Sequence, residues 1–128
     1  MTTTQALDVQ IAVGPGFVSQ LLNANDRGHW ATKEARRRYW LDTTMYRLRG
    51  HAGFGDQHVH IVVTIAWPDR RRRDIGNLAP TAKVLVDAAV RAGILVDDSD
   101  RYVTGPDLRR AYGPHQIRMT ITPTGAAA

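Results

Sequence analysis

Hydrophobic and polar residues alternate in three segments of the chain, and a period of two residues is typical of β-strands. The segments are residues 8–13, 58–67 and 116–122. Residues 101–105 are a candidate for a short fourth strand. Residues 108–114 contain arginines, a glycine and a proline, and we expect them to form a basic turn.

The second of these segments, HVHIVVTIAW, gives the strongest strand signal. Val59, Ile61 and Val63 fall on one face of the strand, and Val62 keeps the other face mostly apolar. Strands that are buried on both faces have this pattern. The segment therefore predicts a central strand covered by helices.

Two helices are expected between the strands. The first has Thr32 as its N-cap and runs to about Arg49, where a glycine ends it. The second can be capped by Asn77 and spans residues 78–92, again followed by a glycine. Strands and helices together predict an α+β fold.

The predicted fold is a single domain over residues 1–128, with a small four-stranded mixed sheet and two main helices. A chain of 128 residues suits one domain, and at this size folding buries roughly two-thirds of the unfolded surface. Residues 123–128 contain proline, glycine and alanine, and we expect a disordered tail there.

Arginine accounts for most of the formal net charge of +5. Codon bias in a GC-rich genome explains an excess of arginine, but it does not explain clustering. Residues 36–38 and 70–73 hold seven of the seventeen basic residues. Such clusters are typical of surfaces that bind phosphate.

The sequence also bears on metal ligands and on location. The chain has no cysteine, so a metal ion would have to bind oxygen or imidazole ligands. No apolar run approaches transmembrane length, and the start MTTTQALDVQ lacks the basic and apolar regions of a signal peptide. We therefore expect a soluble, cytoplasmic protein with no membrane partner.

One side of the first predicted helix carries basic residues and one aromatic residue. This stripe contains Lys33, Arg36, Arg37, Trp40 and Arg47. It has two interpretations: a solvated helix face with an isolated tryptophan, or a face that follows a DNA backbone while the tryptophan stacks on a base or sugar. The second interpretation makes the first four residues of the stripe candidate DNA-binding residues.

Basic and acidic residues lie close together between Asp69 and Asp100. A run of four arginines opens this stretch, and Asp97 and Asp98 lie near its end. Arginine binds phosphate and a carboxylate repels it, so finding both together suggests a cation between protein and phosphate. DNA-backbone contacts are expected from Arg70, Arg71, Arg72 and Arg73, which would position DNA without reading its sequence.

Cleavage of a phosphodiester needs an activated water and a cation that stabilises charge on the phosphate oxygens. Mg²⁺ bound by a few carboxylates supplies both. The candidate ligands are Asp74 and Asp98, followed by Asp97. Lys83 can point back towards Asp74, where an ammonium group would stabilise the transition state or protonate the leaving oxygen.

The same residues also have a purely structural interpretation. Asp97, Asp98 and Asp100 can form an exposed acidic turn, and Asp74 can be a helix cap or an ion-pair partner of the arginines. Short motifs often match by chance, so spacing alone does not separate the two interpretations.

The order of these residues resembles that of the RusA-like Holliday-junction resolvases, which are crossover junction endodeoxyribonucleases. The chain reads PDRRRRDIGNL, then Lys83, then DAAVRAGILVDD. The family pattern is roughly R-R-D-x-D-N-L, a lysine soon after, D-x-L, and A-G-x-x-x-D-D. The close match spans about thirty residues, and looser similarity covers most of the chain.

The resemblance implies a homodimeric endonuclease that depends on Mg²⁺, with Mn²⁺ as a substitute, and that acts on branched DNA such as four-way junctions. Phages and prophages often encode such proteins, so we expect a bacterial or phage-infected cell as the setting. The family's essential carboxylates map onto Asp74 and Asp98, and its essential lysine maps onto Lys83.

Two features depart from the family pattern. The second aspartate of D-x-D-N falls on Gly76, and residues 79–81 resemble an insertion before the lysine. Asn77, Asp97 or extra waters can complete the ligand shell, because Mg²⁺ tolerates several waters. The alternative function is a non-catalytic DNA-junction-binding protein that has lost one metal ligand. A further alternative is a nuclease for flaps or other branched DNA.

The second predicted helix separates the two essential aspartates. A helix over residues 78–92 is roughly 22 Å long at about 1.5 Å per residue, with Asp74 before it and Asp98 after it. Residues 94–96 extend at most about 10 Å and cannot bring the chain back. Either the helix is shorter or bent near Pro80, or the site is shared between two subunits. We hypothesise the shared site, since a two-fold dimer matches the near-symmetry of a four-way junction.

Overall fold

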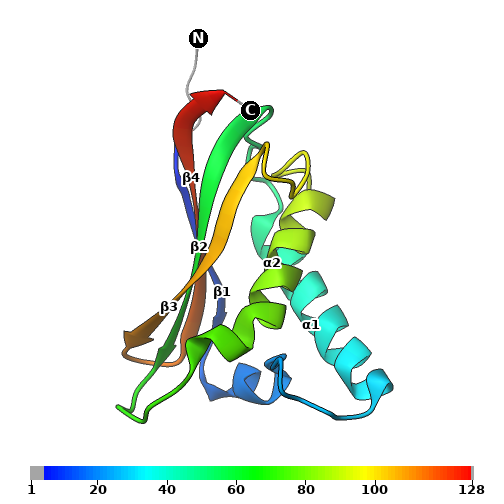
Figure 1. The fold of residues 1–128 in the computed structure, drawn as a ribbon, viewed down its shortest axis with the longest axis vertical. Coiled ribbons are helices and arrows are strands. Elements are labelled where there is room, and N and C mark those ends of the chain that lie inside the picture. Colours follow the sequence, from blue (N-terminus) through cyan, green and yellow to red (C-terminus); the bar gives the residue numbers. More distant parts are fainter. Residues whose placement is uncertain (1–4, 128) are drawn as a thin grey trace.

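The computed structural model describes residues 5–127, and in it the alternating segments form one four-stranded sheet (Figure 1). The strand order is β1-β4-β2-β3. β4 pairs antiparallel with β1 and β2, whereas β2 and β3 are parallel. The strands are β1 (Leu7–Val13), β2 (Gln57–Trp67), β3 (Val103–Tyr112) and β4 (Gln116–Ala127). The predicted α+β fold with a mixed sheet is confirmed.

Two α-helices and two short 3-10 helices complete the fold. The helices are η1 (Pro15–Gln20), α1 (Trp30–Leu48), η2 (Ile75–Leu78) and α2 (Ala79–Arg91). α1 and α2 pack against each other on one side of the sheet (Figure 1). Within residues 5–127, no helix has the length and apolar character needed to cross a membrane.

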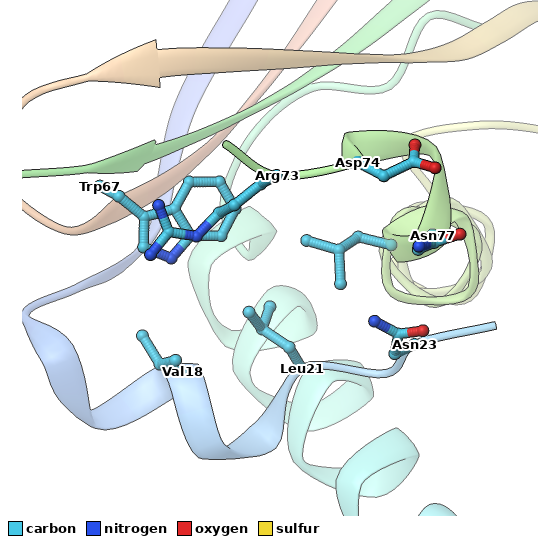
Figure 2. A pocket seen from close by; sticks show the side chains of 8 residues that line it. Val18, Leu21, Asn23, Trp67, Arg73, Asp74 and Asn77 are labelled. Carbon is cyan, nitrogen blue, oxygen red and sulfur yellow. The ribbon is translucent and has the colours of Figure 1, made fainter. Parts of the chain in front are cut away.

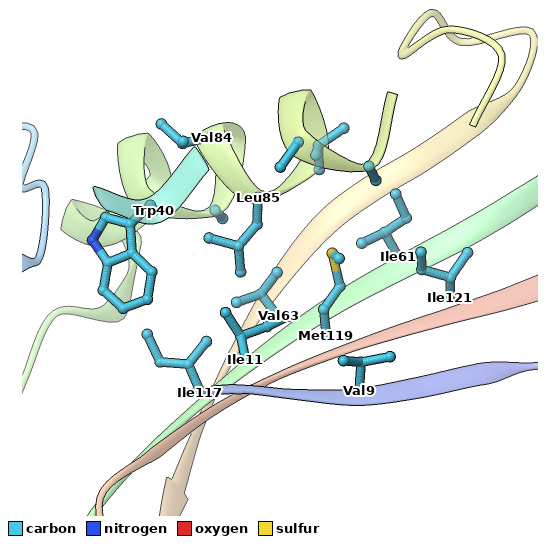
Figure 3. Packing of buried hydrophobic residues seen from close by; sticks show 14 of the residues in the cluster. Val9, Ile11, Trp40, Ile61, Val63, Val84, Leu85, Ile117, Met119 and Ile121 are labelled. Atoms are coloured by element: carbon cyan, nitrogen blue, oxygen red, sulfur yellow. The ribbon is translucent and has the colours of Figure 1, made fainter. Parts of the chain in front are cut away.

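The hydrophobic core lies between the two helices and one face of the sheet (Figure 3). On β2, Ile61 and Val63 point into this core and are fully buried, whereas Val62 and Thr64 on the opposite face are half-buried. β2 is therefore central, as predicted, but the helices cover only one of its faces. The polar residues between the apolar ones fit a sheet that faces solvent on one side.

β3 is longer than the sequence pattern predicts. Residues 108–112, which were expected in a basic turn, continue the strand. Gly105 makes this possible, because its φ is +100° and a Cβ there would lie 2.5 Å from the carbonyl oxygen of Ile61. β3 is also an edge strand, where a proline such as Pro106 is tolerated.

β4 also extends further than expected. The strand continues to Ala127, so the expectation of a disordered tail is wrong for residues 123–127, and residue 128 lies outside the described part. The pairing with β1 ends at Ile121, while pairing with β2 continues along the added segment. Pro123 therefore lies where β4 pairs on one side only, and its missing N–H is tolerated.

Both helices begin differently from the prediction. α1 starts at Trp30 rather than after Thr32, because His29 is the N-cap and its Nδ1 accepts a hydrogen bond from the amide of Ala31 (3.1 Å). α2 follows directly on η2, and its N-cap position is Leu78, which makes no side-chain cap hydrogen bond. The prediction that Asn77 caps this helix is therefore wrong: Asn77 lies within η2, whose N-cap is Asp74.

Candidate metal and nucleic-acid site

The arginine-rich loop after β2 is folded onto itself by one carboxylate. Asp69 accepts hydrogen bonds from Arg73 at 2.6 and 3.1 Å and from the amide of Arg71 at 3.0 Å. The hydrogen bonds from Arg73 hold the pKa of Asp69 well below its usual range, and Asp69 in turn raises the pKa of Arg73. Arg110 of β3 donates to the carbonyl oxygens of Asp69 and Arg71 at 2.6 and 2.8 Å. The loop is therefore a fixed structure.

Aromatic rings hold the guanidinium groups of this loop. Arg73 lies 4.4 Å from the ring centre of Trp67, and Arg70 lies 4.5 Å from that of Tyr112. Arg71 and Arg72 are exposed. Of the four arginines predicted to bind DNA, Arg73 is committed to internal contacts, and the other three present positive charge on the surface.

A pocket of about 390 Å³ lies beside this loop (Figure 2). Arg73, Asp74 and Asn77 line it, together with Asn23 from the segment between η1 and α1. Asp74 is exposed and accepts a hydrogen bond from the amide of Gly76 at 3.2 Å. The structure thus brings together two of the predicted metal ligands, Asp74 and Asn77.

A second pocket, of about 540 Å³, lies between α2 and the edge strand β3. Lys83 and Asp98 both line it, with Pro80 and Gly105. Lys83 is 70% exposed, and its Nζ lies 3.8 Å from Oδ1 of Asp87, which is a loose ion pair. Two of the three predicted catalytic residues therefore share a pocket, although Lys83 lies within α2 and Asp98 follows its end.

Asp74 and Asp98 line different pockets. The two pockets adjoin where Ala24 donates a backbone hydrogen bond of 2.7 Å to Asn77, since Asn23 lines one pocket and Ala24 the other. Figure 1 shows α2 running from the arginine loop to the segment before β3. Asp74 and Asp98 therefore lie beyond opposite ends of this helix, as the sequence predicted. The shared site between subunits stays a prediction.

The acidic segment after α2 is exposed, and Asp97 differs in its role from Asp98. Asp97 accepts a hydrogen bond from the amide of Asp98 at 2.8 Å, which turns the backbone locally. Asp98 lines the pocket with Lys83. Asp97 is thus a less direct candidate ligand than Asp98.

The donors present fit Mg²⁺ in their chemistry. Asp74 and Asp98 are exposed carboxylates, and Mg²⁺ typically takes one or two carboxylates with water and phosphate oxygens. Among residues 5–127, no three or more histidine, aspartate or glutamate side chains are grouped so that they could hold a metal ion. The donors therefore fit an ion held by one or two carboxylates, and they do not fit a closed cage of protein ligands.

The basic stripe predicted on α1 is only partly a surface. Trp40 is 0% exposed, and its Nε1 donates to the carbonyl oxygen of Gln20 at 2.7 Å. The prediction that Trp40 stacks on DNA is therefore wrong. It fails because η1 covers this side of α1, and its Phe17 ring lies edge-on to the indole with ring centres 6.0 Å apart. A helical wheel does not show such a covering element.

The charged residues of the stripe have different environments. Arg36 pairs with Asp26 at 3.0 Å and Arg37 pairs with Glu34 at 3.4 Å, and both arginines are partly exposed. Lys33 is partly exposed and lines a groove with Lys83 of α2. Lys33 and Arg37 thus lie beside α2, whereas Arg36 lies towards η1.

The apparent insertion at residues 79–81 has a structural role that the sequence does not reveal. Thr81 is 0% exposed, and its hydroxyl accepts from the amide of Leu22 (2.7 Å) and donates to the carbonyl of the same residue (2.9 Å). This contact and the Ala24–Asn77 hydrogen bond attach the segment before α1 to the start of α2. The insertion therefore fixes Asn23 at the edge of the candidate site.

Comparison with known proteins adds no family assignment: no protein-family model matches the chain, and a search of curated proteins finds no match. The resemblance to RusA-like resolvases therefore stays a prediction from the sequence.

Proposed function

We propose that this protein is a Mg²⁺-dependent endonuclease that cleaves branched DNA and resolves four-way junctions, with Mn²⁺ as a substitute ion. The supporting observation is that Lys83 and Asp98 line one open pocket between α2 and β3. They are the positions at which the sequence resembles the essential lysine and one essential carboxylate of the RusA-like resolvases. An ammonium and a carboxylate in one pocket suit phosphodiester hydrolysis.

Each residue has a definite part in this proposal. Asp98 and Asp74 would hold Mg²⁺, and the bound ion would supply water activation and neutralisation of charge on the phosphate. Lys83 donates to the phosphate or to the leaving oxygen, since its exposed side chain has only a loose partner in Asp87. Arg71 and Arg72 contact backbone phosphates without selecting sequence.

A homodimer follows from the geometry that the proposal requires. Asp74 and Asp98 lie in different pockets of one chain. A partner subunit related by a two-fold axis can set its Asp74 beside Asp98, and two such sites suit the paired cuts of a four-way junction. In this arrangement the monomer binds DNA but does not cleave it.

The test is cleavage of a synthetic four-way junction by the purified protein, with Mg²⁺ and with EDTA. We expect paired cuts near the branch point only with Mg²⁺ or Mn²⁺. A flap, a fork and a linear duplex of the same sequence complete the panel. Cleavage of the linear duplex at the same rate would reject the preference for branched DNA. Binding of these DNAs without cleavage of any of them would reject the proposal that the protein is an endonuclease.

The second candidate is a protein that binds DNA junctions without cutting them. Gly76 favours it, because this glycine stands where the resembling family has its second aspartate. The sparse donor set within residues 5–127 favours it as well. The arginine loop would serve such a protein equally well, so DNA binding alone does not distinguish the two candidates.

Replacing Gly76 with aspartate is expected to increase the affinity for Mg²⁺. A Cβ at this position meets only Oδ1 of Asp74, at 3.4 Å, so the side chain fits beside the first carboxylate. An added carboxylate near a divalent ion is expected to lower the Mg²⁺ concentration for half-maximal cleavage by about tenfold or more. A Mg²⁺ titration of the junction-cleavage rate measures this change.

Gly76→Asn is the matched control, because it has the same size without the charge. If the aspartate and asparagine variants show the same Mg²⁺ dependence as the original protein, position 76 does not lie near the ion. If only Gly76→Asp cuts and the original protein does not, the non-catalytic candidate is correct.

A further inference from the structure

Trp30 is the most exposed of the three tryptophans. It is the first residue of α1 and is 73% exposed, whereas Trp40 and Trp67 are 0% and 3% exposed. The ring of His29 stacks against it, with ring centres 6.0 Å apart and an angle of 27°. His29 also caps the helix, so its ring is held beside the indole. An exposed indole offers a flat aromatic face on which a base can stack.

The indole borders a groove of about 380 Å³ between α1 and α2. Lys33 and Arg37 of α1 and Lys83 of α2 line the groove, and Leu22 and Val84 supply apolar surface. An aromatic ring beside cationic groups is the combination that binds single-stranded nucleic acid, because the base stacks and the phosphate pairs with charge.

Positive charge prevails at this end of α1. The first turn contains Lys33 and no acidic residue, so no carboxylate opposes the positive end of the helix dipole. Two carboxylates also line the groove: Glu34 accepts a hydrogen bond from Arg37 at 3.4 Å, and Asp87 lies 3.8 Å from Lys83. Together with Lys33 the groove holds three cations, so its formal charge is +1. The groove therefore favours an anion.

Lys83 connects this groove to the candidate cleavage site. It lines the groove with Trp30, and it also lines the pocket with Asp98 on the other side of α2. A phosphate that contacts Lys83 can thus belong to a strand whose neighbouring nucleotide lies in the groove.

We infer that the groove between α1 and α2 binds an unpaired nucleotide next to the branch point of the DNA, with its base stacked on Trp30 and its phosphate between Lys33 and Lys83. The inference rests on the proposed function and adds the feature of the DNA that is recognised. A fully paired duplex keeps its bases stacked on each other and offers none to the indole. The preference for branched DNA then comes from stacking at Trp30 as well as from charge.

The test measures binding of two DNAs in Ca²⁺ without Mg²⁺: a junction with two unpaired thymines at the branch point, and a linear duplex of equal length. We expect Trp30→Ala to weaken junction binding by about tenfold, within the range found for base–aromatic stacking, and to change duplex binding by less than twofold. Trp30→Phe should retain most of the affinity. The exposed Tyr46 lies elsewhere on α1, and Tyr46→Ala serves as the control.

Fluorescence gives a second readout, because the other two tryptophans are buried. The unpaired junction should quench emission in the original protein, and the duplex should not. Unchanged junction affinity in Trp30→Ala, or an equal loss for the duplex, would overturn the inference. If the original protein shows fluorescence quenching with the unpaired junction but cleaves no DNA, the proposed nuclease activity is rejected and the inferred binding site still stands.

Discussion

Replacing Asp98 with asparagine is expected to lower the rate of Mg²⁺-dependent junction cleavage by at least about a hundredfold, the scale for losing one charge-stabilising group at a reacting centre. The amide has the size of the carboxylate but lacks its charge, and Asp98 is exposed, so the fold should not change. Single-turnover cleavage at saturating protein measures the effect, and binding of the same junction in Ca²⁺ should stay within about threefold.

Asp100 provides the matched control for this variant. It is an exposed aspartate two residues further on, and the pocket that contains Asp98 and Lys83 does not include it. Asp100→Asn should cleave at the rate of the original protein. Cleavage by Asp98→Asn at an undiminished rate would contradict the role given to this carboxylate, even if the protein is a nuclease.

Replacing Trp40 with alanine is expected to destabilise the protein by about 3–5 kcal/mol, as large-to-small changes of buried aromatic residues do. The indole is fully buried, contacts Phe17 and Tyr39 edge-on, and donates to the carbonyl of Gln20. The change leaves a cavity and an unpaired carbonyl where η1 meets α1. Urea denaturation followed by circular dichroism measures the free energy of unfolding.

Trp30→Ala is the control variant for Trp40→Ala, because it removes a tryptophan from the same helix without removing a buried contact. Trp30 is largely in solvent, so its loss should change the unfolding free energy by no more than about 0.5 kcal/mol. A Trp40→Ala protein that is as stable as the original but binds DNA weakly would contradict the buried role of Trp40 and support the second interpretation of the α1 stripe, in which this residue stacks on DNA.

Much of the fold could be predicted because the alternation along β2 and the amphipathic pattern of α2 are strong and local. Only the start of β3 was predicted, as the candidate strand at residues 101–105; its remaining length depends on pairing with a distant strand. Gly105 and Pro106 read as a break, yet they lie at an edge strand that tolerates both. The end of β4 was missed for a similar reason, because its order comes from pairing with β2.

The candidate site could be predicted in part. Spacing identified Lys83 and Asp98, and the structure brings them to one pocket. Spacing did not reveal that Arg73 forms an ion pair with Asp69 instead of facing DNA, because this pair requires the loop to fold back on itself. Trp40 was assigned wrongly to the surface because the element that covers it, η1, lies outside the helix.

The most direct test of the central claim is a crystal structure of the protein bound to a four-way junction in Mn²⁺, with the ion located by its anomalous scattering. We expect Mn²⁺ on the carboxylate of Asp98 and on a DNA phosphate that also contacts Lys83, with Asp74 of the same or the partner subunit as a second ligand. A junction bound through the arginine loop, with Asp98 and Lys83 facing solvent and no ion beside them, would contradict the account.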